Sequence, residues 1–388
     1  MRILLVSDEP RDPSMGGPKV ALKLQAGLQE LGHQCEVLFR PELGGRPRSP
    51  RLRLAAAPYL ARRAASARSR AAGRYDIIDA ASAEGWMMVP GAARAVVARS
   101  HGLEHRYYRE LLADAEAGLL RKPWLRRLWY PAVRLAQVRQ ALRRAGRVIL
   151  LSQADRAYVL AQGWQTAERI EVIPHGVDAE RWRQAPAAEA ERGAGLLFCG
   201  WWTTSKGVAY LAQAYALLLQ SGLQPPLTLL GVGTGDATWP GLEARVRAHF
   251  PAAAQPRLRL LPRLQDEAAV FAEYRRHDLL VCPSTSEGFG LVVVEALSQR
   301  LPVVCCQGVG AAELLRDGQE AVLTPARDAP ALAAAVAELW RHPERRRALG
   351  EAGRERVREL SWTAIAARTA ACYQRALGEA PAAAAAGR

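Results

Sequence analysis

The sequence predicts an α/β protein built from two doubly wound, Rossmann-like domains. Short apolar runs, of the length of buried parallel strands, alternate with longer segments of helical character. The alternation starts at residue 3 and starts again at residue 196. A chain of 388 residues is also long enough for two separate cores. We therefore expect an N-terminal domain over residues 1–180 and a second domain over residues 195–361.

The N-terminal domain opens with a predicted β-α-β unit. Residues 3–6 and 36–39 are expected to be strands, and residues 20–31 a helix. The loop before this helix contains Gly16 and Gly17, where backbone amides could approach a phosphate without interference from a Cβ atom. A plain β–α loop would give the same pattern. Further strands of this domain are expected at residues 75–80, 95–99, 148–151 and 170–173.

The second domain carries the most informative stretch, residues 281–296. An apolar strand ends here, Gly288 and Gly290 loosen the backbone around Phe289, and a helix follows. The start of a helix offers unpaired N–H groups and the positive end of the dipole, which suit a phosphate. Glu287 precedes this helix and Glu295 lies about one turn inside it, an axial rise of roughly 6 Å. A glycine-rich turn with one capping acid is the alternative interpretation.

The spacing of the two acids resembles that of a known family. E-G-F-G at 287–290, followed by Glu295, resembles the E-x7-E signature of the retaining glycosyltransferases of family 4, which have the GT-B fold. Other segments resemble motifs of this family in the same order along the chain: residues 7–17, 100–102, 172–178, 198–200 and 206–208. The resemblance extends over nearly the whole chain. It implies two Rossmann-like domains that face each other across a cleft.

Two positions depart from the family pattern. His175 lies in V-I-P-H-G-V-D, where the family usually has Asn. Trp201 follows Gly200, where many members have an Arg that pairs with a Lys on the donor diphosphate. Lys206 could still neutralise one phosphate as a point charge. Arg263 is a candidate for the second cation.

The resemblance implies roles for individual residues. Glu287 would hold hydroxyls of the donor sugar, Glu295 would bind the ribose hydroxyls, and His101 would hydrogen-bond the sugar. The expected catalytic residues are Glu287, His101 and Lys206. Lys206 would stabilise the leaving diphosphate. The backbone expected to bind the donor comprises Gly16, Gly17, Gly288, Phe289, Gly290 and Leu291. The family retains the anomeric configuration, and the leaving phosphate is thought to accept the proton of the acceptor, so we expect no protein base.

The implied substrates are a nucleotide sugar and a sugar acceptor. The donor would be a UDP-sugar or GDP-sugar, and the acceptor a glycan or lipid-linked sugar of cell-surface polysaccharide, lipopolysaccharide or glycolipid synthesis. The sequence contains no D-x-D motif, so we expect a hexosyltransferase that requires no metal and no further cofactor. His105, Arg106 and Arg109 could meet an acidic acceptor. Two alternatives remain: a nucleotide-sugar epimerase of the same fold, and a non-catalytic scaffold that binds nucleotide sugars.

The positive charge is concentrated in the N-terminal half. The net charge is +15, and residues 40–74 hold ten arginines against the single acid Glu42. A second basic stretch, residues 121–147, includes Trp124 and Trp129. The default interpretation is a solvated helical face. The alternative is docking on anionic lipid, worth about 1 kcal/mol per basic residue. The sequence shows no nucleic-acid recognition motif, and we expect no nucleic-acid partner.

Composition also bears on the location of the chain. No apolar run approaches the roughly 18 residues that span a bilayer, and the N-terminus starts with a strand in place of a secretory leader. The six cysteines form no C-x-x-C pair and are expected to be reduced thiols. We therefore expect a cytoplasmic protein that can dock on the inner face of the membrane. We further expect a linker over residues 184–194, a C-terminal helix over about 362–378 that returns to the first domain, and a disordered tail over 380–388.

Overall fold

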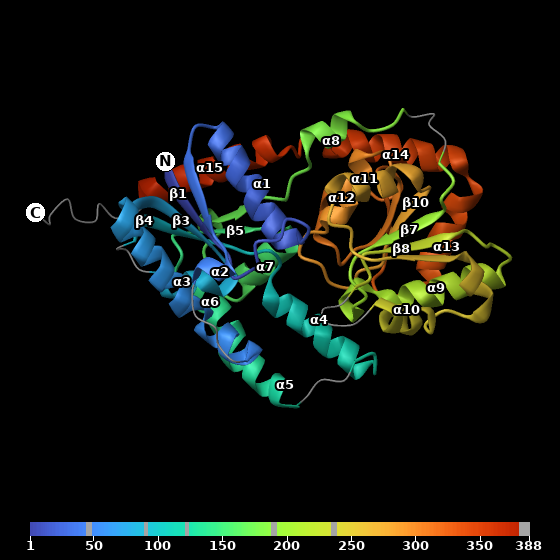
Figure 1. Ribbon diagram of the computed structural model, residues 1–388, viewed down its shortest axis with the longest axis horizontal. Helices are drawn as coiled ribbons and strands as arrows, with labels where there is room; N and C mark the ends of the chain where they lie inside the picture. Colours follow the sequence, from blue (N-terminus) through green and yellow to red (C-terminus); the bar gives the residue numbers. More distant parts are fainter. Residues whose placement is uncertain (44–48, 89–91, 121–123, 188–191, 234–238, 380–388) are drawn as a thin grey trace, which may run out of the picture. The chain divides into compact units, whose positions relative to one another are not determined.

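The computed structural model divides the chain into two compact units, each described here by itself (Figure 1). It describes residues 1–43, 49–88, 92–120, 124–187, 192–233 and 239–379. The expected tail, and residues 188–191 of the expected linker, lie outside these ranges. Unit 1 comprises Met1–Arg106, Lys122–His175 and the segment from Trp362 onward. Unit 2 comprises Tyr107–Arg121 and Gly176–Ser361.

Unit 1 contains a parallel six-stranded sheet of order β2-β1-β3-β4-β5-β6. Its strands are β1 (Arg2–Val6), β2 (Gln34–Leu38), β3 (Tyr75–Ala81), β4 (Ala93–Arg99), β5 (Arg147–Leu150) and β6 (Ile170–Val172). The chain runs from β1 to one edge of the sheet and then returns to build the other side from β3 onward. Ligands of doubly wound sheets bind at such a reversal, beyond the carboxyl ends of the strands.

Helices flank this sheet (Figure 1). Those that begin in unit 1 are α1 (Gly16–Glu30), α2 (Arg40–Leu43), α3 (Pro50–Ala72), α4 (Glu104–Glu116), α5 (Trp124–Tyr130), α6 (Ala136–Arg144), α7 (Gln153–Ala161) and α15 (Trp362–Glu379). The C-terminal helix α15 packs tightly on α1, because a Cβ atom on Gly27 would lie 2.8 Å from the Cβ of Ala366. Only a residue without a side chain allows this approach.

A buried polar network joins α15 to the sheet of unit 1. The Arg99 guanidinium donates two hydrogen bonds, of 2.9 and 2.7 Å, to one oxygen of Asp79. The Tyr373 hydroxyl donates to the same oxygen at 2.5 Å. All three side chains are buried. Burial would lower the pKa of Arg99, but Asp79 outweighs this effect and raises the pKa, so Arg99 stays charged. A buried charge is tolerated when it is paired in this way.

Unit 2 contains a second parallel six-stranded sheet, of order β12-β11-β10-β7-β8-β9. Its strands are β7 (Leu196–Cys199), β8 (Leu227–Leu230), β9 (Leu258–Leu261), β10 (Leu279–Cys282), β11 (Val303–Cys306) and β12 (Val322–Thr324). The central pair is β10 and β7, where the chain direction across the sheet reverses. The two sheets confirm the predicted α/β architecture, and every strand predicted above matches an observed one to within two residues.

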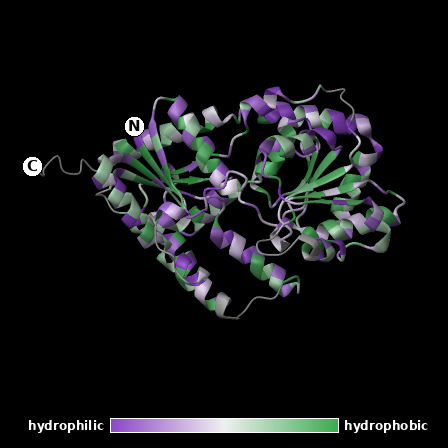
Figure 2. Cartoon of the chain, in the orientation of Figure 1, coloured by the Kyte–Doolittle hydropathy of each residue, from purple (hydrophilic) through white to green (hydrophobic). Residues whose placement is uncertain are grey.

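The helices of unit 2 cover both faces of its sheet. They are α8 (Ala179–Arg183), α9 (Val208–Gln220), α10 (Trp239–Arg247), α11 (Glu267–Arg276), α12 (Leu291–Ser298), α13 (Ala329–Arg341) and α14 (Pro343–Val357). In Figure 1, α11, α12 and α14 lie on one side of the sheet, and α9, α10 and α13 on the other. The strands of both units are strongly apolar and the helices are two-sided (Figure 2), as a sheet covered on both faces requires.

The segment Tyr107–Arg121 belongs to unit 2, although the sequence places it among elements of the first domain. Arg327 ties this segment to the rest of unit 2. Its guanidinium forms ion pairs of 2.7 Å with Glu110 and 2.9 Å with Asp114, both on α4. The Asp114 side chain is fully buried.

No helix within the described ranges is both long enough and apolar enough to cross a bilayer.

Candidate active site

Three loops meet at the carboxyl ends of β7, β10 and β11 in unit 2. The amide of Thr285 donates to the carbonyl of Ser205 at 2.9 Å, which joins the loop after β10 to the loop after β7. The amide of Gly310 donates to the carbonyl of Glu287 at 3.2 Å, which joins the loop after β10 to the loop after β11. Backbone hydrogen bonds therefore fix the segment that carries Glu287 from both sides.

Gly207 is required by this loop packing. It has φ +69°, and a Cβ atom there would lie 1.9 Å from the carbonyl oxygen of Pro283. No side chain fits such a gap, and the left-handed backbone also favours glycine. The glycine of the Lys-Gly pair thus lets Lys206 approach the loop after β10.

Gly290 has a comparable role at the start of α12. Its φ is +91°, and a Cβ atom would lie 2.5 Å from Cγ1 of Val309. Gly290 is the N-cap residue of α12 and carries no capping side chain. The first turn of α12 therefore starts directly from a compact glycine turn, with Leu291 as its first residue.

Lys206 and Glu287 form an ion pair at the centre of the three loops. The Lys206 Nζ lies 2.5 Å from Glu287 Oε1, and the Ser284 hydroxyl donates to Glu287 Oε2 at 3.0 Å. The side chains of Lys206 and Glu287 remain 23% and 16% exposed, so a ligand can reach both. Burial would lower the pKa of Lys206, but the Glu287 carboxylate outweighs it and raises the pKa. Lys206 is therefore held as a cation beside a fixed carboxylate.

Glu295 lies in the interior of α12. Its side chain is buried, and the hydroxyl of Tyr274 on α11 donates to its Oε2 at 3.0 Å. The structure thus brings together, within one unit, the predicted residues of the glycine turn, Lys206 and the start of α12, with Glu295 inside that helix. Arg263 lies elsewhere, in the loop after the edge strand β9, which two strands (β7 and β8) separate from β10.

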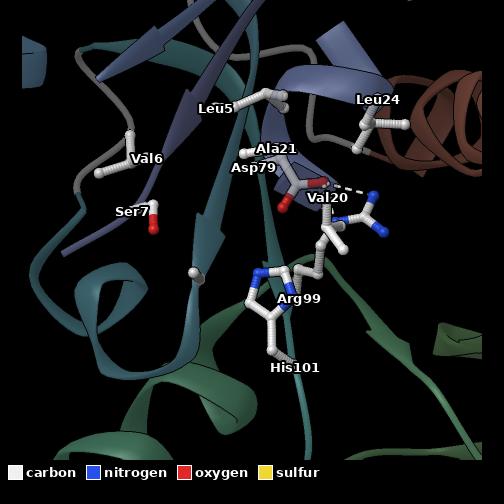
Figure 3. A pocket seen from close by; sticks show the side chains of 10 residues that line it. Leu5, Val6, Ser7, Val20, Ala21, Leu24, Asp79, Arg99 and His101 are labelled. Atoms are coloured by element: carbon white, nitrogen blue, oxygen red, sulfur yellow. Dashed lines mark hydrogen bonds and ion pairs between the residues drawn. The ribbon is translucent and has the colours of Figure 1, made fainter. Parts of the chain in front are cut away.

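His101 and a small pocket lie at the corresponding edge of the sheet in unit 1. The pocket is lined by apolar side chains of β1 and α1 and by Ser7, Asp79, Arg99 and His101 (Figure 3). Burial, with a smaller contribution from Arg99, lowers the pKa of His101 to about 4. The imidazole is therefore neutral near pH 7. Its Nδ1 is buried and has no hydrogen-bond partner among the described residues.

His175, which replaces the usual Asn of the family, packs beside His101. The centroids of the His101 and His175 rings are 5.8 Å apart, and those of His175 and Trp362 are 6.2 Å apart. His175 is buried, and burial followed by the neighbouring His101 lowers its pKa well below the usual value. The three rings thus form a tilted, uncharged cluster in unit 1.

Gly16 and Gly17 are the first two residues of α1, so they belong to the helix and not to the preceding loop. The carboxyl group of Glu9 occupies the space beside Gly17, because a Cβ atom there would lie 2.7 Å from Glu9 Oε1. Burial raises the pKa of Glu9. The loop after β1 therefore places a carboxyl group at the start of α1, where the sequence predicts a donor phosphate.

The three predicted acceptor residues have different surroundings. His105 packs edge-on against Trp164 at 4.5 Å, and burial lowers its pKa to about 4. Arg106 forms an ion pair of 2.8 Å with Asp155. Arg109 is exposed. Two of the three side chains thus have structural partners in unit 1, and a neutral His105 offers no charge to an acidic acceptor.

Several residues of the site escaped the sequence analysis. Ser284 and Tyr274, which hold the two acids, carry no motif of their own. In unit 1, Arg134 lies buried in a π-helical segment (Pro131–Leu135) and pairs with Glu84 at 3.1 Å and Glu104 at 2.8 Å. Burial raises the pKa of Glu84 to about 7. The sequence signal for this cluster is Pro131, which interrupts a helical pattern and is the first residue of the π-helical segment. Such segments are frequent at functional sites.

Among the described residues, the His, Cys, Asp and Glu side chains form no group of three or more that could hold a metal ion.

The two Rossmann-like units and the Lys-Gly and glycine turns define a protein of the GT-B class. Two family models match the chain. Glycosyltransferase Family 4 matches residues 15–181, and Glycosyl transferases group 1 matches residues 193–342. The chain belongs to glycosyltransferase family 4.

Individual relatives agree with this assignment. A D-inositol 3-phosphate glycosyltransferase of Thermobispora bispora is 30% identical over 259 residues, which are 64% of this chain and 60% of the relative. The chain thus spans about 60% of the length of this curated relative. Sucrose-phosphate synthase from Thermosynechococcus elongatus superimposes with a TM-score of 0.79, at 22% identity, over 97% of this chain and 99% of that one. Anabaena Alr3699/HepE, solved with UDP-glucose, gives a TM-score of 0.68 at 20% identity over 97% and 100% of the two chains. These likenesses confirm the GT-B fold.

Gly207→Ala should destabilise unit 2 much more than the matched variant Gly222→Ala. Both glycines have positive φ, but nothing lies within 4 Å of a Cβ atom on Gly222. Backbone strain alone costs about 1–2 kcal/mol, and the collision with Pro283 should add about 2 kcal/mol or more. Thermal and urea unfolding of the two variants provide the measurement. Equal losses would show that the loops tolerate a side chain at position 207.

The neutral His101 predicts a pH dependence of stability. Its folded pKa of about 4 lies below the ordinary value of 6.5, so the unfolded chain takes up the proton first as the pH falls. Protonation of His101 therefore costs stability between about pH 7 and pH 4, by roughly 1 kcal/mol at pH 5.5. His101→Gln should remove this contribution, while those of His105 and His175, whose pKa values are also lowered, remain. Urea unfolding at pH 8 and pH 5.5 measures the loss for each protein, and an equal loss in wild type and His101→Gln would contradict the prediction.

Proposed function

We propose that the chain is a retaining glycosyltransferase. It would transfer a hexosyl group from a UDP-sugar or GDP-sugar to a glycan or lipid-linked acceptor, in the synthesis of cell-surface polysaccharide or glycolipid. The observation that carries this proposal is the Lys206–Glu287 pair beside the start of α12, with Glu295 inside the same helix. The complex of the structural neighbour Alr3699/HepE with UDP-glucose supports a nucleotide-sugar donor.

The donor diphosphate is proposed to bind at the start of α12. The amides of the glycine turn and the helix dipole attract an anion there, and Lys206 supplies a full positive charge. Lys206 has three N–H donors, so it can keep its contact with Glu287 while it binds a phosphate oxygen. Glu295 accepts hydrogen bonds from the ribose hydroxyls, and Glu287 accepts from hydroxyls of the sugar. Gly16, Gly17 and Arg263 remain further candidates for contact with the donor.

The reaction exchanges one bond at the anomeric carbon for another. The bond from C1 to the diphosphate oxygen breaks, a bond from C1 to the acceptor oxygen forms on the same face, and the acceptor proton passes to the leaving phosphate. Positive charge develops on the sugar ring and negative charge on the diphosphate. Lys206 and the α12 amides stabilise the latter, and this preorganised charge lowers the barrier. The neutral His101 is proposed to hydrogen-bond the donor sugar.

The proposed roles predict a loss of transfer activity in two variants. The donor is first identified by thermal stabilisation of the protein against a panel of nucleotide sugars. Lys206→Ala and Glu287→Ala should each lower transfer of radiolabelled sugar by about 100-fold or more, since each removes a charge at the reacting centre. The matched controls Arg183→Ala and Glu180→Ala break an exposed ion pair of the same unit and should retain activity.

Full activity in both site variants would refute the proposed site. Conversion of the donor in the absence of any acceptor would identify an epimerase instead. Donor binding without turnover on any acceptor would identify a binding protein.

We also propose that α3 docks on anionic lipid. One face of this helix is packed in the core through Ala57, Ala61 and Ala65. Its other face exposes Leu52, 59% accessible, and Tyr59, 55% accessible, among arginines that are also exposed: Arg51, Arg62, Arg63 and Arg70. Apolar side chains within a basic face suit a headgroup layer.

Sedimentation with liposomes tests this docking. Binding to vesicles with anionic lipid should exceed binding to neutral vesicles, and Arg62, Arg63 and Arg70 changed together to Gln should weaken it by about 100-fold, because each of the three arginines contributes about 1 kcal/mol. The control changes Arg341, Arg347 and Arg358 to Gln, which removes the same charge from exposed positions of unit 2. Equal binding to both kinds of vesicle would contradict the proposal.

A further inference from the structure

We propose that Tyr274 is a positioning residue that sets the orientation of Glu295 for recognition of the donor ribose. The inference rests on the proposed function, because it assumes that Glu295 meets the sugar of the nucleotide. Tyr274 lies on α11, outside the glycine turn, whereas Glu295 lies on α12. The proposal thus gives α11 a role in recognition of the ribose.

The geometry of Tyr274 is that of a fixed hydrogen-bond donor. Its side chain is fully buried, and its hydroxyl donates to Glu295 Oε2 at 3.0 Å. The ring packs edge-on against Phe271 with 5.5 Å between centroids, and the hydroxyl also lies 3.7 Å from Cys199 Sγ at the end of β7. The ring packs on Phe271 and its hydroxyl lies between Cys199 and Glu295, with the Glu295 carboxylate as the nearer acceptor.

The carboxylate needs such a partner. Glu295 is 7% exposed, so most of its surface is out of contact with water. A buried carboxylate is costly unless hydrogen bonds satisfy it. One hydrogen bond on Oε2 also fixes the rotation of the carboxyl group, which gives Oε1 a defined direction. The two hydroxyls of a ribose are donors, and a fixed carboxylate oxygen is a directional acceptor for them.

Tyr274 remains a donor over the whole range of a binding assay. Burial raises the pKa of its hydroxyl well above the usual value, and the neighbouring Cys199 and Glu295 raise it further. Loss of the hydroxyl should therefore change recognition of the ribose and leave recognition of the diphosphate, which depends on Lys206 and α12, unchanged. A residue that only stabilised the fold would weaken both equally.

The test compares ribose recognition in Tyr274→Phe with that in a matched control. Tyr215→Phe also removes one buried hydroxyl from unit 2, which donates to the carbonyl of Pro225 at 2.6 Å. Calorimetry gives the Kd of the full-length protein for UDP and for 2′,3′-dideoxy-UDP, and for GDP and 2′,3′-dideoxy-GDP. The ratio of the two Kd values measures the contribution of the ribose hydroxyls.

Wild type and Tyr215→Phe should prefer the ribonucleotide by the same factor. In Tyr274→Phe the preference should fall by about 10-fold or more, through a higher Kd for the ribonucleotide only, as expected for loss of one hydrogen bond to a charged group. Glu295→Gln should lower the preference as well, and the double variant should be no worse than Glu295→Gln, because Tyr274 acts through Glu295.

An unchanged preference in Tyr274→Phe, or an equal loss for both nucleotides, would overturn the positioning role and leave the donor site in place. If the losses of preference from Tyr274→Phe and Glu295→Gln added up in the double variant, the positioning role would also be overturned. Failure of wild type to bind UDP or GDP at all would instead overturn the proposed donor site, and the inference with it. Poor folding of Tyr274→Phe would show in its melting temperature, and the Kd values would then be measured well below that temperature. The fraction of folded protein cancels in the ratio of the two Kd values, so a lost preference still supports the role and an unchanged preference still contradicts it.

Discussion

The ion pair between Lys206 and Glu287 is the interaction around which unit 2 is arranged. It joins the loop after β7 to the loop after β10, and it exists only because Gly207 lets the two backbones touch. Ser284 occupies the second oxygen of Glu287. A partly buried cation is thus placed beside a carboxylate whose orientation is fixed before any ligand arrives. Preorganised charges of this kind are the usual source of transition-state stabilisation.

Unit 1 uses paired charge in a different way. Asp79, Arg99 and Tyr373 close a network inside the protein, and the histidines beside it are kept neutral by burial. The two units therefore present unlike surroundings at the carboxyl ends of their strands. In unit 2 the charges remain within reach of a ligand. In unit 1 the charged pair is internal, and the polar group at the edge of the sheet is an uncharged imidazole. Such a division suits the proposed transfer reaction, in which the diphosphate needs a cation and the sugar needs hydrogen bonds.

The sequence was sufficient for the strands, the glycine turn and the Lys-Gly pair, because each depends on residues that are close along the chain. Apolar runs specify buried parallel strands, and the glycines of both turns are visible in the sequence, although their close approaches to Pro283 and Val309 are not. Tyr274 could not be predicted, because its contact with Glu295 depends on how α11 packs on α12. The same limit applies to His105 and Arg106. Their partners, Trp164 and Asp155, come from a later part of unit 1 that no spacing rule connects with them.

Arg327 binds the part of unit 2 that comes from early in the chain, the segment Tyr107–Arg121. It is one of the few residues other than glycine with positive φ among those described, at +65°, and its guanidinium holds the buried Asp114 on α4. Arg327 thus pairs the segment that contains the second sheet, Gly176–Ser361, with an earlier part of the chain. Exchange of Gly176–Ser361 alone between related glycosyltransferases would leave Arg327 without its own Glu110 and Asp114, so Tyr107–Arg121 belongs in the same exchange.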